Sequence, residues 1–253
     1  MQLTMLGVGS SAGTPIVGCQ CTTCLSDNPR NKRLRCSAAI TTDNGAVILI
    51  DTGPDLRTQA LRASLNCVDA VLYTHTHADH LHGIDDLRAF CQIQKKQIPL
   101  YGKSDAMQHI QSKFGYAIRE PGEFWDLPVL SLNPIKGPFE VLGVKVTPIP
   151  VRHGYSDILG YRIGNMAYLT DVSDIPKASL DLLDGLEVLM LDCLRHEPHY
   201  THINVEQSID YASLIKARNT YFIHMTHDLE YEKLSAELPK NMHVSYDGLK
   251  LNF

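Results

Sequence analysis

Four side chains that can bind a metal ion stand within six consecutive residues, in the run His75-Thr76-His77-Ala78-Asp79-His80. A strand-like apolar stretch, residues 69–74, leads directly into this run and places it on a tight turn. Imidazole and carboxylate groups together suit zinc, manganese or iron. The alternative is a solvated polar turn with hydrogen-bonded histidines, but packing does not account for such a density of metal-binding groups. The run therefore predicts a metal site at the end of a strand.

Other polar candidates also follow predicted strands. Apolar runs of strand length occupy residues 3–7, 46–51, 144–151, 161–170, 187–192 and 220–224. Asp51, Asp171 and His224 stand at or just beyond the ends of three of these runs. Because chemistry assembles readily on loops that leave a rigid sheet, we expect these side chains to join the histidine run.

Helical patterns separate the predicted strands. Ser104 is expected to cap one helix, and Asn204 with Gln207 forms the pattern of a capping box before another. Residues 120–138 contain several prolines and few regular signals, so they are expected to form a loop. This alternation of strands and helices predicts an α/β protein.

Length and charge limit the function classes. One domain, residues 1–253, can fill the chain. A net charge of -5 is a poor match for many phosphate contacts, so we expect a small substrate and no long nucleic acid partner. No N-terminal stretch joins basic residues to a long apolar run, and no run reaches the length of a membrane span. Together with an odd number of cysteines, seven, this predicts a cytoplasmic chain without a membrane partner.

The motif of His75, His77, Asp79 and His80 resembles the H-x-H-x-D-H signature of the metallo-β-lactamase superfamily. Further landmarks of that family follow in order along nearly the whole chain, each at a predicted strand end: Asp51, His153, Asp171 and His224. The resemblance implies a four-layer αβ/βα sandwich, the metallo-β-lactamase fold, with the active site on one edge.

The same resemblance implies two divalent metals, zinc or manganese, in the active site. The expected ligands are three for each metal and one bridging carboxylate: His75, His77 and His153; Asp79, His80 and His224; and Asp171. Two cations about 3.5–4 Å apart can bind a bridging hydroxide and stabilise both the attacking and the leaving oxygen. Asp79 is therefore also counted among the catalytic residues. Asp51 is expected either to orient the motif loop by hydrogen bonds or only to cap its strand.

Three cysteines crowd into six residues near the N-terminus: Cys19, Cys21 and Cys24. A structural zinc needs four nitrogen or sulfur ligands, whereas the plain alternative is three small buried residues at a chance spacing. With Gly13-Thr14-Pro15, the cluster resembles the phosphoribosyl cyclic phosphodiesterase family, and the resemblance implies a structural zinc whose fourth ligand is His227.

The remaining cysteines receive no ligand role. Cys36 also matches a feature of that family, and Cys67, Cys91 and Cys193 are expected in the core.

Three histidines stand between Asp171 and His224. His196 and His199 are expected on a solvated loop. His202 lies where the cyclic phosphodiesterases have a histidine, and the resemblance implies that it donates a proton or hydrogen bond near the scissile phosphate. Histidine suits that role because its unperturbed pKa lies near neutrality.

A short basic cluster follows the cysteines: Arg30, Lys32, Arg33 and Arg35. Such a run is usually a solvated face, but it could form a phosphate-attracting rim, and the sequence leaves its role open. Arg152 could likewise be either a solvated side chain or part of a phosphate-attracting rim.

The leading hypothesis is a metal-dependent phosphodiesterase that hydrolyses a small cyclic ribose phosphate or cyclic nucleotide to a phosphomonoester through a dinuclear metal-bound hydroxide. His202 would assist the departing sugar oxygen. Alternatives are a tRNA-end-processing endonuclease, a thioester or lactam hydrolase, and a non-hydrolytic protein like that of pyrroloquinoline-quinone biosynthesis. The sequence is also compatible with a homodimer.

Overall fold

The computed structural model describes residues 1–118 and 129–253, and the described residues form two seven-stranded sheets. The first sheet contains, in spatial order, β14 (Lys250–Asn252), β1 (Gln2–Gly7), β2 (Ser37–Thr41), β3 (Val47–Ile50), β4 (Ala70–Leu72), β5 (Ile98–Gly102) and β6 (Leu130–Pro134). The second contains β13 (Met242–Val244), β12 (Asn219–Ile223), β11 (Val188–Asp192), β10 (Met166–Leu169), β9 (Ser156–Ile163), β8 (Val144–His153) and β7 (Phe139–Val141).

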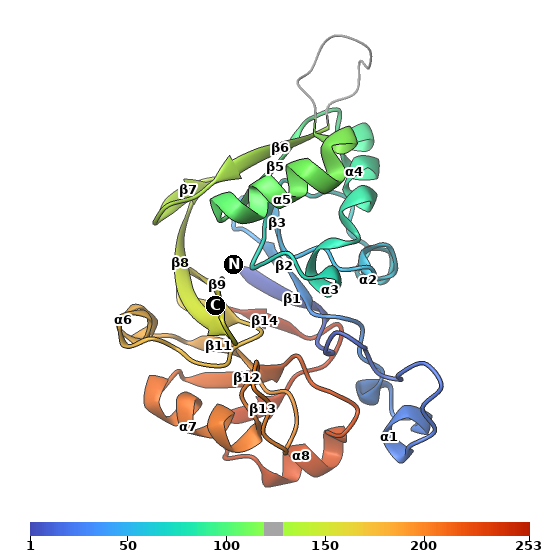
Figure 1. Cartoon of the computed structure of the whole chain (residues 1–253), viewed down its shortest axis with the longest axis vertical. Helices are drawn as coiled ribbons and strands as arrows, with labels where there is room; N and C mark the ends of the chain where they lie inside the picture. The colour runs from blue at the N-terminus through green and yellow to red at the C-terminus, as the bar shows by residue number, and fades with distance from the viewer. Residues whose placement is uncertain (119–128) are drawn as a thin grey trace.

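Helices cover the outer face of each sheet (Figure 1). The first sheet carries α2 (Leu56–Ala63), α4 (Leu87–Gln94) and α5 (Ser104–Phe114), and the second carries α6 (Lys177–Leu180), α7 (Val205–Ile215) and α8 (Tyr231–Glu237). Two one-turn helices, α1 (Thr22–Leu25) and α3 (Ala78–Leu81), and four 3-10 turns, Pro29–Asn31, Ile84–Asp86, Gly115–Ala117 and Asp181–Leu183, complete the elements. The helix-sheet-sheet-helix layers confirm the predicted four-layer αβ/βα sandwich. α1 belongs to a small N-terminal lobe that projects from the sandwich (Figure 1).

Strand β3 shows why the sheets are apolar on both faces. Ile48 and Ile50 point into the core between the two sheets, whereas Val47 and Leu49 belong to the core under α2, α4 and α5. Successive strand residues face opposite sides, so a strand covered on both sides is apolar throughout. Burying each of these side chains contributes about 1.5–3 kcal/mol.

Strand direction places the polar residues. β3 and β4 run parallel in the first sheet, and β10, β11 and β12 run parallel in the second. Parallel strands end at the same edge of their sheet, so the residues that follow them are gathered there. The loops after these five strands, together with the end of β8, hold the histidines and aspartates described below.

Three local expectations need correction. The single strand expected over residues 161–170 is the end of β9 and all of β10, which pair antiparallel around a turn where Gly164 has a φ of +55°. The loop expected over residues 120–138 lies partly outside the described residues, and its later part contains strand β6. Ser104 is the first helical residue of α5 rather than its cap, which is Lys103.

The capping box of α7 is confirmed, because Asn204 and Gln207 each accept the other's backbone N–H, at 2.9 and 3.0 Å. In the described part of the chain, no helix combines the length and the apolar character needed to cross a bilayer.

Candidate metal centre

The predicted active-site ligands form two adjoining groups that share one carboxylate. Within each group the candidate ligand atoms all lie within 4.8 Å of one another. The first group is His75, His77, His153 and Asp171, and the second is Asp79, His80, Asp171 and His224. The fold thus brings together all seven residues, although they come from four separate segments of the chain.

Asp171 lies at the centre of both groups. Its Oδ1 atom is 3.9 Å from the Nε2 atoms of both His75 and His153, and 3.5 Å from Nε2 of His224. Its Oδ2 atom is 3.1 Å from Nε2 of His80. A carboxylate that faces imidazoles from both groups is placed to bridge two cations.

Hydrogen bonds on the opposite ring nitrogen orient three of the histidines. Nδ1 of His153 donates to the carbonyl of Thr201 at 2.9 Å, and Nδ1 of His80 donates to Asp51 at 2.8 Å. The Thr74 hydroxyl already donates to Asp51, so it accepts from Nδ1 of His75 at 3.0 Å. Each bond holds the proton on Nδ1 and leaves the Nε2 lone pair facing the site, as a metal ligand requires.

The site's buried nitrogens fit a cation. The Nε2 atoms of His75, His80 and His224 are buried and have no hydrogen-bond partner among the described residues. An unsatisfied buried polar atom costs about 1–3 kcal/mol, and a divalent metal on these lone pairs would remove that cost. The donor set of imidazoles and carboxylates also suits divalent metals.

The pKa values of the site reflect burial and the facing carboxylates. Burial lowers the pKa values of His75 and His153, which favours the neutral imidazole that binds metals. Burial acts to lower the pKa values of His80 and His224, but Asp171 and the neighbouring carboxylates outweigh it: the pKa of His80 lies well above its ordinary value and that of His224 rises to about 9, so a metal would have to displace a proton from each. Burial acts to raise the pKa of Asp171, but the facing imidazoles of His224 and His80 outweigh it and hold that pKa well below its usual range. Asp171 is therefore an ionised carboxylate.

Three site residues have a strained backbone. Asp51, Asp171 and His224 have φ angles of 61°, 58° and 60°, in the left-handed region that non-glycine residues seldom adopt. Such conformations cost of order 1–3 kcal/mol and persist where the surrounding structure enforces them. Here each one turns a side chain inward directly after a parallel strand.

Asp51 is not among the ligand atoms but supports them. Buried beneath the site, it accepts hydrogen bonds from the backbone N–H and the hydroxyl of Thr74, both at 2.8 Å, and from His80. Of the two interpretations open from the sequence, orienting the motif loop is the one that these contacts support. The loop also needs Gly53, because a Cβ there would lie 2.1 Å from the backbone oxygen of Asp79.

His202 lies against the same centre, and Asp192 holds it. The ring of His202 stacks on that of His224, with centroids 4.8 Å apart and planes 12° apart. Nδ1 of His202 is 3.2 Å from Oδ2 of Asp192, while its Nε2 is 3.9 Å from Asp171. Asp192 also accepts the backbone N–H of Asp171. Sequence reasoning missed Asp192; its place at the end of a predicted strand, like Asp51 and Asp171, is the signal that could have identified it.

The other two histidines of this loop lie farther out. His196 is exposed, as expected. His199 is only partly exposed, and its Nδ1 lies 3.0 Å from the hydroxyl of Thr201.

The cysteine cluster forms a second group with His227. The Sγ atoms of Cys19, Cys21 and Cys24 lie 3.3, 3.2 and 3.5 Å from Nδ1 of His227. Tetrahedral zinc, with bonds of about 2.3 Å to sulfur and 2.0 Å to nitrogen, separates these ligands by about 3.5 Å. A hydrogen bond from the backbone N–H of Cys24 lowers the pKa of Cys21 to about 6, which favours the thiolate. Burial raises the pKa of Cys24 to about 11, so zinc would have to displace a proton from that thiol. The distances fit a zinc ion.

Of the remaining cysteines, Cys36, Cys91 and Cys193 are buried. Cys67, expected in the core, is only partly buried at the edge of the helix-covered core.

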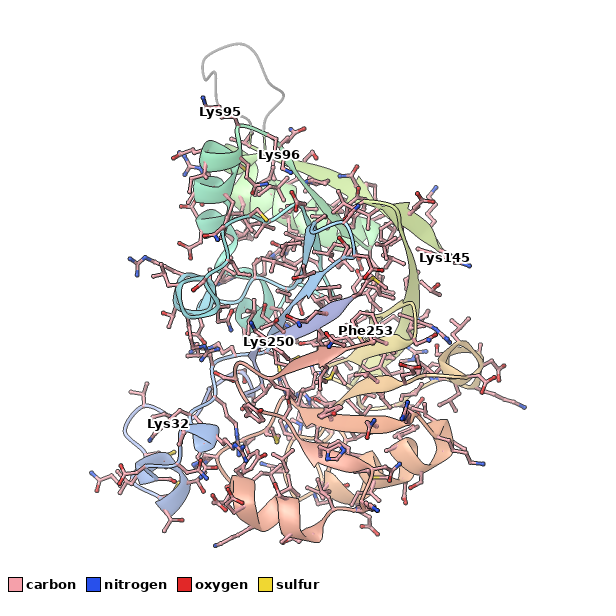
Figure 2. All side chains as sticks on the ribbon, turned by 180° about the vertical axis from the view of Figure 1, so that it is seen from behind. Lys32, Lys95, Lys96, Lys145, Lys250 and Phe253 are labelled. Atoms are coloured by element: carbon pink, nitrogen blue, oxygen red, sulfur yellow. The ribbon has the colours of Figure 1, made fainter. Side chains whose placement is uncertain are left out.

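The basic cluster is a set of internal contacts. Lys32 lies on the N-terminal lobe (Figure 2) and donates to the carbonyl of Cys24 at 3.0 Å. Arg33 is buried and donates to the carbonyls of Thr226 and Leu229, on either side of His227. Arg35 pairs with an aspartate, and the Arg30 guanidinium lies over two tyrosine rings. Neither a wholly solvated face nor a free phosphate rim describes the cluster, which instead fastens the cysteine lobe to the loop after β12.

Comparisons with known proteins agree with this architecture. Residues 47–225 match the family model of the beta-lactamase superfamily domain. A protein named octanoyltransferase from Porphyromonas gingivalis is 38% identical over 254 positions, which are 99% of this chain but 51% of that protein. The chain thus spans about half the length of that relative. The anti-Pycsar protein Apyc1 from Paenibacillus harenae is 24% identical over 201 residues, 74% of this chain and 81% of that protein.

Solved structures give the same picture. The structure described as a new diphosphatase from the PhnP family has a TM-score of 0.93 and 41% identity, and the match covers 100% of this chain and 97% of that one. Zinc-bound PqqB from Methylobacterium extorquens has a TM-score of 0.81 and 21% identity, with both chains fully covered. At 21% identity, the likeness to PqqB shows a shared fold and nothing more.

Proposed function

The chain belongs to the beta-lactamase superfamily, and within it we propose a metal-dependent phosphodiesterase that hydrolyses a small cyclic phosphate. The coarser activity, a hydrolase of the metallo-β-lactamase fold that binds divalent metal, follows from the family and the His/Asp groups. Two zinc or manganese ions in the active site and one structural zinc are part of the proposal.

The observation that carries the proposal is His202 beside the shared carboxylate. Divalent cations held by the two groups would polarise a phosphodiester and lower the pKa of water. Hydrolysis adds water across one P–O bond, and the departing sugar oxygen must take up a proton. We assign that proton to Nε2 of His202, while Asp192 accepts the Nδ1 proton and holds the ring in place. The product is a phosphomonoester.

Electrostatics favour a small substrate over tRNA. The net charge is -5, and the basic residues at positions 30–35 are engaged in contacts within the protein. Among the alternatives, a non-hydrolytic binding protein has no need of a histidine-aspartate pair beside a two-part ligand set. These observations support a phosphodiesterase over both alternatives.

A second candidate substrate is a diphosphate bond. The full-length structural relative at 41% identity is described as a diphosphatase, and the same site could attack a phosphoric anhydride. The name octanoyltransferase belongs to a relative twice as long as this chain, so an octanoyl thioester is included in the test as a third substrate.

The test begins with purified, metal-loaded protein and five substrates: a nucleoside cyclic phosphate, a cyclic ribose phosphate, a linear dinucleotide, a dinucleoside diphosphate and an octanoyl thioester. The proposal expects the cyclic phosphates to have the highest kcat/KM. Turnover of only the diphosphate or only the thioester, with no turnover of the cyclic phosphates, would contradict the proposal.

A variant then tests the proton donor. His202→Ala should lower turnover of a cyclic phosphate by about 10²–10⁴-fold with metal content unchanged. An activated aryl phosphodiester should lose much less, since its leaving group needs little protonation. His196→Ala, at an exposed histidine of the same loop, is the matched control. Equal losses on both substrates would mean that His202 positions the substrate instead of protonating it.

A further inference from the structure

Two tyrosines stand uncovered beside the metal centre. Tyr155 is 100% exposed and Tyr200 is 79% exposed. Tyr155 lies two residues after the ligand candidate His153, in the two-residue turn between β8 and β9. Tyr200 lies two residues before His202. Single exposed aromatic residues are ordinary, but here two of them flank one site from separate loops.

The two loops are fastened to each other. Nδ1 of His153 donates to the carbonyl of Thr201 at 2.9 Å, which joins the end of β8 to the residue after Tyr200. Between them, Gly154 has a φ of +58°, and a Cβ on it would lie 2.8 Å from Cγ2 of Thr201. The backbone N–H of Gly154 donates to the Ser173 hydroxyl at 2.9 Å. The backbone that carries both tyrosines is therefore held in a defined position.

The metal centre is open to solvent at one of its ligand candidates. His77 is the exposed member of the ligand groups, and its ring centroid lies 5.1 Å from that of His153. The loops of Tyr155 and Tyr200 meet at His153, the ligand candidate next to this exposed histidine. The ring of Tyr200 is already tilted over that of His199, with centroids 4.8 Å apart. Aromatic faces at this place are suited to stacking on a planar ring.

We propose that Tyr155 and Tyr200 bind the base of a cyclic nucleotide whose phosphate lies at the metal centre. The inference rests on the proposed function and narrows its substrate class to phosphates that carry a planar base. Stacking on the tyrosine rings makes no hydrogen bond to the edge of the base, so the affinity should depend little on which base the nucleotide carries. A cyclic ribose phosphate without a base would lose both stacking contacts.

The test compares a nucleoside 2′,3′-cyclic phosphate with methyl riboside 2′,3′-cyclic phosphate, in which a methyl group replaces the base. Wild-type protein should prefer the nucleotide in kcat/KM. Tyr155→Leu and Tyr200→Leu should each lower kcat/KM for the nucleotide by about tenfold, which corresponds to about 1.4 kcal/mol for the lost stacking contact. Each should lower kcat/KM for the methyl riboside by less than about twofold. Tyr116→Leu, at an exposed tyrosine of a 3-10 turn on the first sheet's side, is the matched control.

A binding measurement separates this inference from the proposed function. Nucleoside 5′-monophosphate and ribose 5-phosphate are titrated onto the metal-loaded proteins by calorimetry. Tighter binding of the nucleotide that weakens in the two variants supports the stacking role even if no cyclic phosphate is cleaved, a result that would overturn only the proposed function. Equal binding of the two probes, or equal losses on both, overturns the inference. A change of oligomeric state in the variants also overturns it, because the tyrosines would then belong to a subunit interface.

Discussion

Replacing Asp51 by asparagine should weaken metal binding without unfolding the protein. The Asp51 carboxylate is fully buried and accepts three hydrogen bonds, the last from Nδ1–H of His80. Asparagine has the same shape and tolerates the left-handed φ of 61° at this position. Its amide carries one acceptor oxygen only. If that oxygen still accepts the hydrogen bond from the backbone N–H of Thr74, the NH₂ group takes the place of Oδ2. It then lies about as far from Nδ1 of His80 as Oδ2 does in the wild type.

The His80 tautomer then reverses. To accept from the new amide, Nδ1 of His80 must give up its proton, and the proton moves to Nε2, the atom 3.1 Å from Asp171. A protonated Nε2 cannot bind a metal. The lost hydrogen bond to a charged acceptor is worth about 1.5–3 kcal/mol, which corresponds to roughly 10–150-fold in affinity. Losses of 10–100-fold are typical when a residue that orients a metal ligand is changed.

Competition with a chromophoric chelator measures this loss. The affinity of the active-site position that includes His80 should fall by about 10–100-fold, while the cysteine site and the far-ultraviolet circular dichroism stay unchanged. Asp69→Asn, at a second aspartate next to a strand of the first sheet, is the control. Unchanged affinity at both active-site positions would refute the argument that Asp51 fixes the tautomer of His80.

Three further predictions follow from other parts of the molecule. Asp171→Ala should empty both active-site positions in a folded protein that retains about one zinc; elemental analysis that finds a single metal in well-folded wild-type protein would contradict the two-metal proposal. Cys21→Ser should release one zinc and lower Tm, because a structural metal contributes to folding, and an unchanged Tm with unchanged zinc content would exclude that role. Burial raises the pKa of Asp247 to about 6 from its ordinary 3.8, so the folded state holds this proton more tightly than the unfolded chain does. The stability of the wild type relative to Asp247→Asn should therefore fall as pH rises from about 4 to about 6 and then level off, and denaturant titrations that give a constant difference would contradict this.

The sequence was most informative where the signal is local. The run from His75 to His80 places four candidate ligands on one turn through covalent spacing alone, and the cysteine cluster does the same for three thiols. The order of the strand ends then allowed Asp171 and His224 to be assigned by resemblance. The capping box of α7 could be read because both of its partners lie within four residues.

Prediction failed where the answer depends on turns or on strand pairing. The run over residues 161–170 is continuously apolar, and its division into β9 and β10 depends on one left-handed glycine that leaves the periodicity nearly unbroken. Strand β6 was missed because its neighbours in the sequence suggest a loop, whereas pairing with β5 determines its conformation.

By itself, the sequence determined the ligand types, their grouping along the chain and the layered α/β class. Only the tertiary structure decided which distant groups support them: that Asp192 holds His202, that Arg33 is buried between the cysteine lobe and the loop after β12, and that a hydrogen bond joins the loops of Tyr155 and Tyr200. The reason is that short-range spacing is carried by covalent geometry, whereas the meeting of residues far apart in the chain depends on strand order and register. The charge state and role of a buried Asp or Arg depend on those meetings, because neighbouring dipoles and charges, and not the residue type, set its energy.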